Sequence, residues 1–145
     1  MIVLDACAIV DMVRQTPDGL ALQQLMLNDE PAISCDLIRA ETASAFRKLA
    51  RTEGLSASQA ERYCSEAIAL VDEFYPMAEL QTEALRESIR LDHSTYDLFY
   101  FILARRTGAT LFTLDRKLMA LCAAHGVDCV AEVSLRPEPS GHATS

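Results

Sequence analysis

The sequence predicts an α/β protein, a three-layer sandwich with a mostly parallel central sheet of about five strands and helices on both faces. Short apolar runs of strand length alternate with longer stretches of helical periodicity, as expected of strands joined by helical crossovers. Half of the 145 residues are apolar, so the chain can bury a core of its own. The five cysteines include no C-x-x-C pair, which argues against a disulfide framework or a zinc site.

The first part of the chain is expected to hold two strands and two helices. Residues 2–4 form a short apolar run typical of a buried strand. Residues 6–13 have a helical pattern that the Thr-Pro-Asp-Gly segment at 16–19 interrupts, and helix resumes over residues 20–27. Residues 31–34 fit a second short strand.

The middle part is expected to form a helical hairpin and an edge strand. Residues 35–52 have a long helical pattern that stops near Gly54, and a second helix follows over about residues 56–73. Their short connection predicts antiparallel packing. Residues 74–77 are expected to form a strand at the edge of the sheet, because Pro76 cannot donate a ladder hydrogen bond.

The last part repeats the alternation. Residues 80–91 are helical, and a very apolar helix follows from about residue 95 to residue 106. A strand at 110–114, a helix at 115–125 and a final strand at 127–130 complete the pattern.

One domain of residues 1–135 is expected, followed by a disordered tail, residues 136–145, that is rich in Pro, Ser and Gly. No basic residue precedes the apolar N-terminal run, and no uncharged apolar stretch is long enough to span a bilayer. We therefore expect a cytoplasmic protein without membrane association. The net charge of −8 predicts weak non-specific binding to nucleic acid and a basic patch that is only local.

Four acidic residues are candidates for chemistry. Asp5 follows the first strand and Asp115 follows the strand at 110–114; if these strands are neighbours, both carboxylates lie at one edge of the sheet. Glu41 interrupts a row of apolar residues spaced by four along its helix, where a carboxylate is rare unless it is paired or binds metal. Asp97 begins the most apolar helix of the chain.

Each of these residues also has a purely structural interpretation. Glu41 can lie at the margin of its helix face and reach water. Asp97 fits a capping box that starts at Ser94, and Asp115 fits the N-cap of the following helix. Thr113 is either an ordinary strand residue or a hydrogen-bond partner of a carboxylate or of a metal-bound water.

Taken together, the four acids indicate metal-dependent hydrolysis of phosphodiesters. Hard cations such as Mg²⁺ or Mn²⁺ prefer carboxylate oxygens, and a metal-assisted site can hold a phosphodiester while it activates water. We expect all four acids to be catalytic, with Asp5, Asp97 and Asp115 as metal ligands. The histidines at 93, 125 and 142 lack ligand spacing and are expected on the surface, and no phosphate-binding glycine loop or G-x-S-x-G motif occurs.

The order of these features resembles the PIN domain and, within it, the VapC toxins of bacterial toxin–antitoxin pairs. The resemblance covers roughly residues 1–131. It implies a parallel sheet and an endoribonuclease that uses Mg²⁺ or Mn²⁺ to cut RNA. It also implies a homodimer that acts on tRNA or rRNA and binds a VapB-like antitoxin. Cys7 departs from the Ser or Thr that the family often has there. The four segments that carry the resemblance, each with one of the acids, are residues 2–10, 37–45, 96–104 and 110–118.

Three alternative functions remain at this stage. The chain can be a catalytically idle PIN-like module that only binds RNA or protein, although the intact set of four acids argues against it. It can be a PIN ribonuclease without an antitoxin. A Mg²⁺-dependent phosphohydrolase of another class is the third, and it lacks a candidate nucleophile motif in this sequence.

Overall fold

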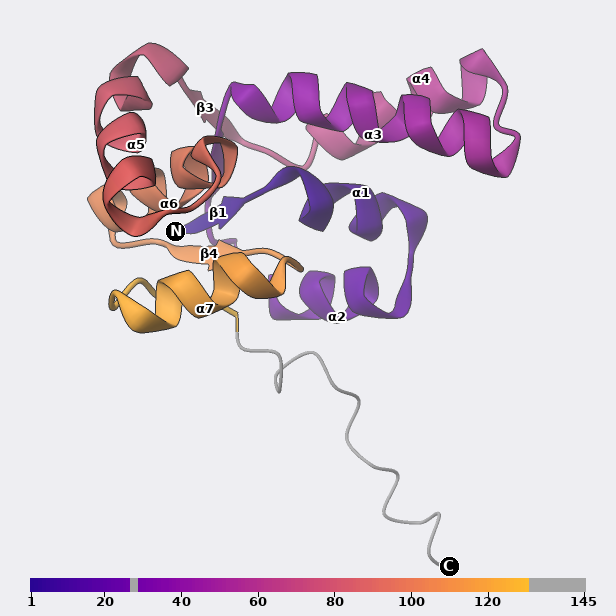
Figure 1. Cartoon of the computed structure of the whole chain (residues 1–145). Coiled ribbons are helices and arrows are strands. Elements are labelled where there is room, and N and C mark those ends of the chain that lie inside the picture. The colour runs from indigo at the N-terminus through magenta and orange to yellow at the C-terminus, as the bar shows by residue number, and fades with distance from the viewer. Residues whose placement is uncertain (27–28, 131–145) are drawn as a thin grey trace, which may run out of the picture.

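The computed structural model of the chain describes residues 1–26 and 29–130, so the expected tail at 136–145 lies outside the described residues. Four parallel strands form one sheet in the order β3-β2-β1-β4, and helices flank it (Figure 1). The predicted α/β class and parallel sheet are confirmed. The described strands are β1 (Ile2–Leu4), β2 (Ala32–Cys35), β3 (Glu73–Tyr75) and β4 (Thr110–Phe112). The described helices are α1 (Ala6–Arg14), α2 (Pro17–Leu25), α3 (Leu37–Glu53), α4 (Ala57–Ile68), α5 (Met77–Leu91), α6 (Thr95–Thr107) and α7 (Arg116–Ala124).

The core is built around β1 and α6. All three residues of β1 are buried, and this strand lies between β2 and β4. Seven consecutive residues of α6, from Leu98 to Ala104, are buried, and the helix packs against β1, β2 and β4. A helix that is apolar on every side is stable only when its whole circumference is covered. The burial expected from its composition is therefore confirmed.

Helices α3 and α4 form the predicted hairpin. They lie side by side and are joined by the short loop after Gly54 (Figure 1). Gly54 ends α3 in a left-handed conformation (φ 70°), which favours glycine. Between the helices, the rings of Phe46 and Tyr63 stack with centroids 6.3 Å apart.

The predicted break between the first two helices is present, but it is confined to Gln15 and Thr16 instead of extending to residue 19. The structure starts α2 at Pro17, and the Thr16 side chain accepts a hydrogen bond from the backbone N–H of Gly19. Proline fits the first turn of a helix because that turn needs no N–H donor. The same residues that interrupt α1 therefore begin the next helix.

The boundaries around β3 also differ from those predicted. Helix α4 ends at Ile68 rather than near residue 73, and Glu73 pairs with Ile33 in the sheet. The edge position of β3 is confirmed. Pro76 lies just after the strand and serves as the N-cap of α5, so a residue that predicted an edge strand marks the strand's end.

The predicted strand at 127–130 is reduced to one parallel bridge between Leu111 and Cys129. The neighbouring backbone bonds, Leu111 N–H to the Asp128 oxygen (2.8 Å) and Val130 N–H to the Leu111 oxygen (3.1 Å), extend the sheet beyond β4 by this single contact. The described sheet thus has four strands, close to the five expected. Within the described ranges, no helix has the length and apolar character to cross a membrane.

Candidate active site

The site forms where β1 and β4 end. The two strands are parallel neighbours, with Leu4 opposite Phe112, and the backbone N–H of Asp5 donates to the Phe112 oxygen at 3.3 Å. The strand order assumed from the sequence is therefore correct for this pair. Asp5 and the residues after Phe112 emerge at the same edge of the sheet, where α/β proteins place their ligands.

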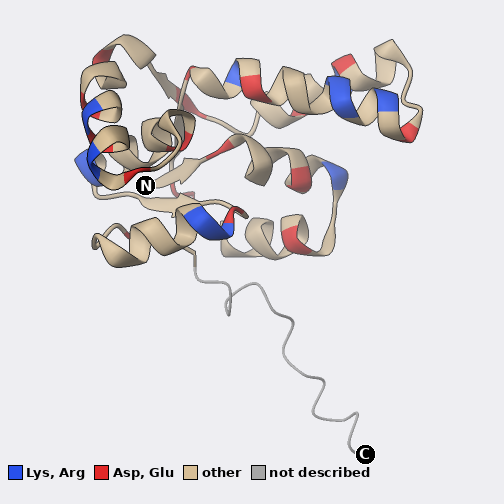
Figure 2. Cartoon of the chain, in the orientation of Figure 1, with Lys and Arg blue, Asp and Glu red and all other residues tan. Residues whose placement is uncertain are grey.

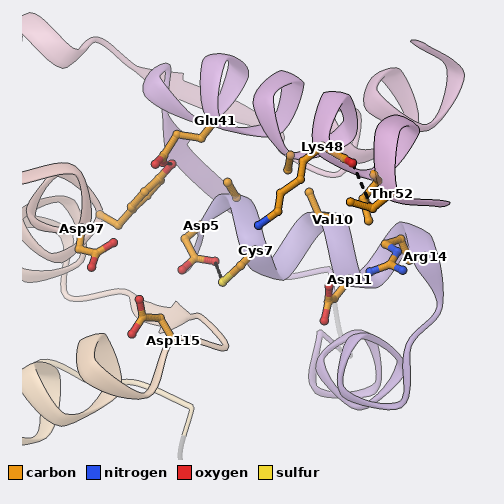
Figure 3. Close-up of a pocket in the computed structure, with 14 residues that line it drawn as sticks. Asp5, Cys7, Val10, Asp11, Arg14, Glu41, Lys48, Thr52, Asp97 and Asp115 are labelled. Carbon is orange, nitrogen blue, oxygen red and sulfur yellow. Dashed lines mark hydrogen bonds between the residues drawn. The ribbon is translucent and has the colours of Figure 1, made fainter. Parts of the chain in front are cut away.

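One cavity of about 430 Å³ brings the four predicted acids together. Asp5, Glu41, Asp97 and Asp115 all line it, although they come from four different segments. Figure 3 shows Asp97 and Asp115 on the side opposite Asp5, with Glu41 on the α3 side. The sheet topology brings Asp5 and Asp115 together, as expected from the sequence, and the packing of α3 and α6 against the sheet adds Glu41 and Asp97.

Asp5 is fixed at the floor of the cavity. It is 5% exposed, and it caps α1 because its Oδ1 accepts the backbone N–H of Ala8 at 2.9 Å. The thiol of Cys7 donates to the same oxygen at 3.0 Å. Burial raises the pKa of Asp5 from 3.8 to about 6, and the charge of Asp97 adds to the rise. The structure therefore holds a carboxylate here at a cost in free energy.

Thr113 and Cys7 support this floor. Thr113 is fully buried, and its Oγ1 accepts the backbone N–H of Asp115 at 3.0 Å. Its hydroxyl also lies 3.6 Å from the Cys7 sulfur, and both side chains oppose the rise in the pKa of Asp5. Cys7 thus occupies the donor position expected of a Ser or Thr. Its thiol is kept protonated, because burial and the neighbouring Asp5 charge raise its pKa.

Asp97 lies in the first turn of α6, but the predicted capping box is absent. The N-cap residue Ser94 makes no side-chain capping bond. The Asp97 Oδ2 instead lies 3.0 Å from Nε2 of His93. Burial raises the pKa of Asp97, and the charge of Asp115 raises it further. The interpretation of Asp97 as a helix cap is therefore wrong for this structure.

His93 is not the surface residue that the sequence suggested. Its side chain is 13% exposed, and its backbone is tied to α5 because Ser88 Oγ donates to the His93 oxygen at 2.5 Å. The adjacent Asp92 adopts a left-handed conformation (φ 50°) that turns the chain from α5 into α6. A histidine four residues before an aspartate, across a helix start, is the only sequence signal that could have indicated this contact.

Glu41 and Asp115 each use one oxygen for a structural bond. The Tyr100 hydroxyl donates a short hydrogen bond to Oε1 of Glu41, and burial raises the pKa of this carboxyl, with a further contribution from Asp97. Asp115 caps α7 as predicted, because its Oδ1 accepts the N–H groups of Lys117 (2.8 Å) and Leu118 (3.2 Å). The second oxygen of Asp115 makes no hydrogen bond within the described part of the chain.

The four carboxylates interact electrostatically through Asp97. Its charge raises the pKa values of Asp5 and Glu41, and Asp115 raises that of Asp97. As the side chains are placed, no three His, Cys, Asp or Glu residues among those described form a group close enough to hold a metal ion. The four carboxylates thus line the same cavity, but their side chains are not close enough together to form a metal-binding group as they are placed.

Three further charged residues line the cavity, and the sequence analysis did not select them as candidates. Lys48 extends from α3 with its ammonium directed toward Cys7 and Asp5, on the side of Asp5 away from Asp97 and Asp115 (Figure 3). Arg14 pairs with Glu53 at 2.5 Å, and Asp11 accepts the Thr16 hydroxyl at 3.2 Å. The position of Lys48, seven residues after Glu41 and so on the same helix face, was a signal available in the sequence.

The fold and the site together define a parallel α/β protein in which four acids line one cavity near the carboxyl edge of the sheet. The chain belongs to the PIN domain family, which it matches over residues 2–124. Members of this family are generally nucleases.

Solved structures similar to this chain include two PIN-fold proteins of known source. Covering 93% of each chain at 20% identity, PAE2754 from Pyrobaculum aerophilum gives a TM-score of 0.66. VapC20 from Mycobacterium tuberculosis, described as a sarcin–ricin loop cleaving toxin, gives 0.61 at 19% identity over 83% of this chain and 95% of its own. At these identities the similarity establishes the fold. Among curated proteins, no significant match was found.

Proposed function

We propose that the protein is a metal-dependent endoribonuclease that hydrolyses RNA phosphodiester bonds, with Asp5, Glu41, Asp97 and Asp115 as its catalytic residues. The observation that carries the proposal is the convergence of these four carboxylates on one cavity at the carboxyl edge of the sheet. Membership of the PIN family supports the nuclease class.

The donor set fits Mg²⁺ or Mn²⁺. All four groups are carboxylates, which hard divalent cations prefer. Burial raises the pKa values of Asp5, Glu41 and Asp97, and the charge of a neighbouring carboxylate raises them further, so a bound cation would stabilise the ionised site. Asp5, Asp97 and Asp115 would hold the ion. When bound, the ion supplies a polarised phosphoryl group and a more acidic water.

The protein's own residues would orient and move protons around the phosphodiester. Asp5 and Asp115 each commit Oδ1 to a helix N-terminus, which fixes the carboxylate while the second oxygen stays available. Tyr100 holds Glu41 by one oxygen in the same way. The raised pKa of Glu41 suits a group that accepts a proton from the attacking water, because a base works best when its pKa approaches the working pH. Thr113 would steady Asp5 from the floor of the cavity.

We further propose that the protein is the toxin of a VapBC-type pair, acting in the cytoplasm on tRNA or rRNA as a homodimer and inhibited by a VapB-like antitoxin. The similarity to VapC20 supports this finer assignment. A PIN ribonuclease without an antitoxin is the second candidate. Expression of the chain in a bacterial host separates the two: a toxin arrests growth, and co-expression of the gene immediately upstream relieves the arrest.

Metal-dependent cleavage of RNA tests the proposed activity. Purified protein should cut a mixed RNA pool with Mg²⁺ or Mn²⁺ and stop when EDTA is added. Protein that binds RNA but never cuts it would favour the catalytically idle module instead.

His93 should act as a positioning residue for Asp97. Its ring lies 3.0 Å from the Asp97 carboxylate, and partners of this kind typically contribute about 10–100-fold to metal affinity or activity. We expect His93→Ala to raise the Mn²⁺ concentration for half-maximal cleavage by about tenfold, and His93→Gln, which retains an amide donor, to recover part of the loss. The control is His125→Ala. His125 is exposed, and its ring makes a T-shaped contact with the Phe101 ring, away from Asp97. Equal metal requirements in the His93 and His125 variants would show that the contact does not matter.

A further inference from the structure

Three basic residues gather on the second half of α3. Arg47, Lys48 and Arg51 are all exposed, and Figure 2 shows blue segments along this half of α3. We call these three residues the α3 basic face. The chain as a whole carries 21 acidic and 13 basic residues, so a local cluster of cations runs against its overall charge.

The side chains of the α3 basic face have no polar partners in the part of the chain that the structure describes. Across the described residues, none of the three makes a hydrogen bond or an ion pair, whereas Arg14 pairs with Glu53, and Arg105 pairs with Glu83 and Glu87. In a chain with an excess of acids, neighbouring carboxylates would readily neutralise such cations. Their freedom leaves three positive charges available to an external anion.

A surface hollow connects this face with the acidic cavity. The hollow is lined by Arg47, Lys48 and Arg51, and it shares Glu41, Ala45, Lys48 and Thr52 with the cavity. Lys48 belongs to both and reaches toward the acids (Figure 3). From Glu41 to Arg51 the helix rises by about 15 Å, a length over which an extended nucleic-acid strand presents several phosphates.

We propose that the α3 basic face binds the phosphates of the RNA strand next to the bond that is cut. The inference rests on the proposed ribonuclease activity, and it assigns the path of the substrate outside the catalytic centre. A phosphodiester backbone matches the face because it offers regularly spaced negative charge along a groove that continues into the site. Contacts of this kind position the strand without reading its sequence. They also reconcile RNA binding with a net charge of −8, because the attraction is confined to one helix.

Salt-dependent binding of RNA tests the proposal. We would measure the Kd of a fluorescent, mixed-sequence single-stranded RNA of about 15 nucleotides in the Asp97→Asn background, in which cleavage is suppressed. The triple variant R47A/K48A/R51A should weaken binding by on the order of tenfold at near-physiological salt, and it should reduce the slope of log K against log salt by about 2, at about 0.7 for each lost contact with a single strand. All three positions are exposed on a helix, so alanine should preserve the fold.

The matched control is R39A/R62A/R86A, which removes the same charge from other exposed positions. It should change the affinity by no more than about twofold. Equal losses in the two triple variants would overturn the proposal, because the effect would then reflect total charge. Unchanged RNA binding in the α3 triple variant, with loss of binding to a poly-glutamate peptide, would also overturn it in favour of an acidic protein partner. A separate experiment detects failure of the proposed activity. In that case the wild-type protein, with all four acids, would bind RNA but would not cut it in the presence of Mn²⁺.

Discussion

Asp97→Asn should lower the rate of RNA cleavage by at least about a hundredfold while the protein stays folded. Asp97 is the residue through which the other acids interact. Its charge raises the pKa values of Asp5 and Glu41, and the charge of Asp115 raises the pKa of Asp97. Asparagine keeps the size and one oxygen acceptor, but it removes the charge that would bind the metal ion. The loss should therefore exceed the roughly 10–100-fold typical of residues that only orient a metal ligand.

Asp11 provides the matched control for this prediction. It lines the same cavity, and burial raises its pKa, but it is held by Thr16 and lies outside the group of four acids. Asp11→Asn should change the cleavage rate by less than about threefold. Steady-state cleavage of a labelled RNA at saturating Mn²⁺, with circular dichroism to verify folding, measures both variants. Similar rates for Asp97→Asn and Asp11→Asn would contradict the assignment of the four acids.

The metal-free protein should lose stability as the pH rises through the range in which Asp5 ionises. The pKa of Asp5 is about 6 in the folded protein and near 3.8 when unfolded, so the folded state binds the proton more tightly. The unfavourable contribution is absent below pH 3.8 and complete above pH 6. It amounts to about 3 kcal/mol in full, of which about 2 kcal/mol falls between pH 4.5 and pH 7.

Urea denaturation in EDTA at pH 4.5 and pH 7 measures this effect, with Asp5→Asn as the comparison. Asparagine can still accept the Ala8 N–H through its Oδ1, so the helix cap is retained while the titration is removed. Glu87, whose pKa is lowered to about 2 by Arg90 and Arg105, adds stability with rising pH, but that gain is nearly complete by pH 4.5. If the free energy of unfolding changes equally in the wild type and in Asp5→Asn between pH 4.5 and pH 7, ionisation of Asp5 does not destabilise the folded protein, and the expectation is contradicted.

The sequence was sufficient to predict the parallel sheet. The four acids selected from the sequence line one cavity, and their catalytic role stays a prediction. Three features that depend on local pattern are all present: a strand of three buried apolar residues, a helix with seven consecutive apolar residues, and a helical hairpin that begins after a glycine stop. The predicted element boundaries were wrong where a residue type is compatible with more than one structural position. Pro17 disfavours the interior of a helix but suits its first turn. Residues 127–130 have strand composition, but Cys129 alone pairs with β4, through Leu111.

The contacts around the acids could not be predicted, because they depend on tertiary packing. His93 reaches Asp97 only because Asp92 reverses the chain between α5 and α6. Tyr100 is buried with the rest of α6, as the composition of this helix indicates, and its hydroxyl also donates a hydrogen bond to Glu41 on α3. Lys48 differs from these contacts, because helix periodicity alone places it on the same face of α3 as Glu41.

Thermal melts with and without Mn²⁺ test the central claim, that the four acids form a metal site. We expect Mn²⁺ to raise the melting temperature of the wild type, since an ion that binds only the folded state adds about 2.7 kcal/mol at a hundred times its dissociation constant. In EDTA, Asp97→Asn should melt at the same temperature as the wild type or higher, because one of four repelling charges is gone, and its response to Mn²⁺ should be much smaller. A variant that melts lower in EDTA yet shows the full Mn²⁺ shift would contradict the account, because Asp97 would then be structural and the metal, if bound, would lie elsewhere.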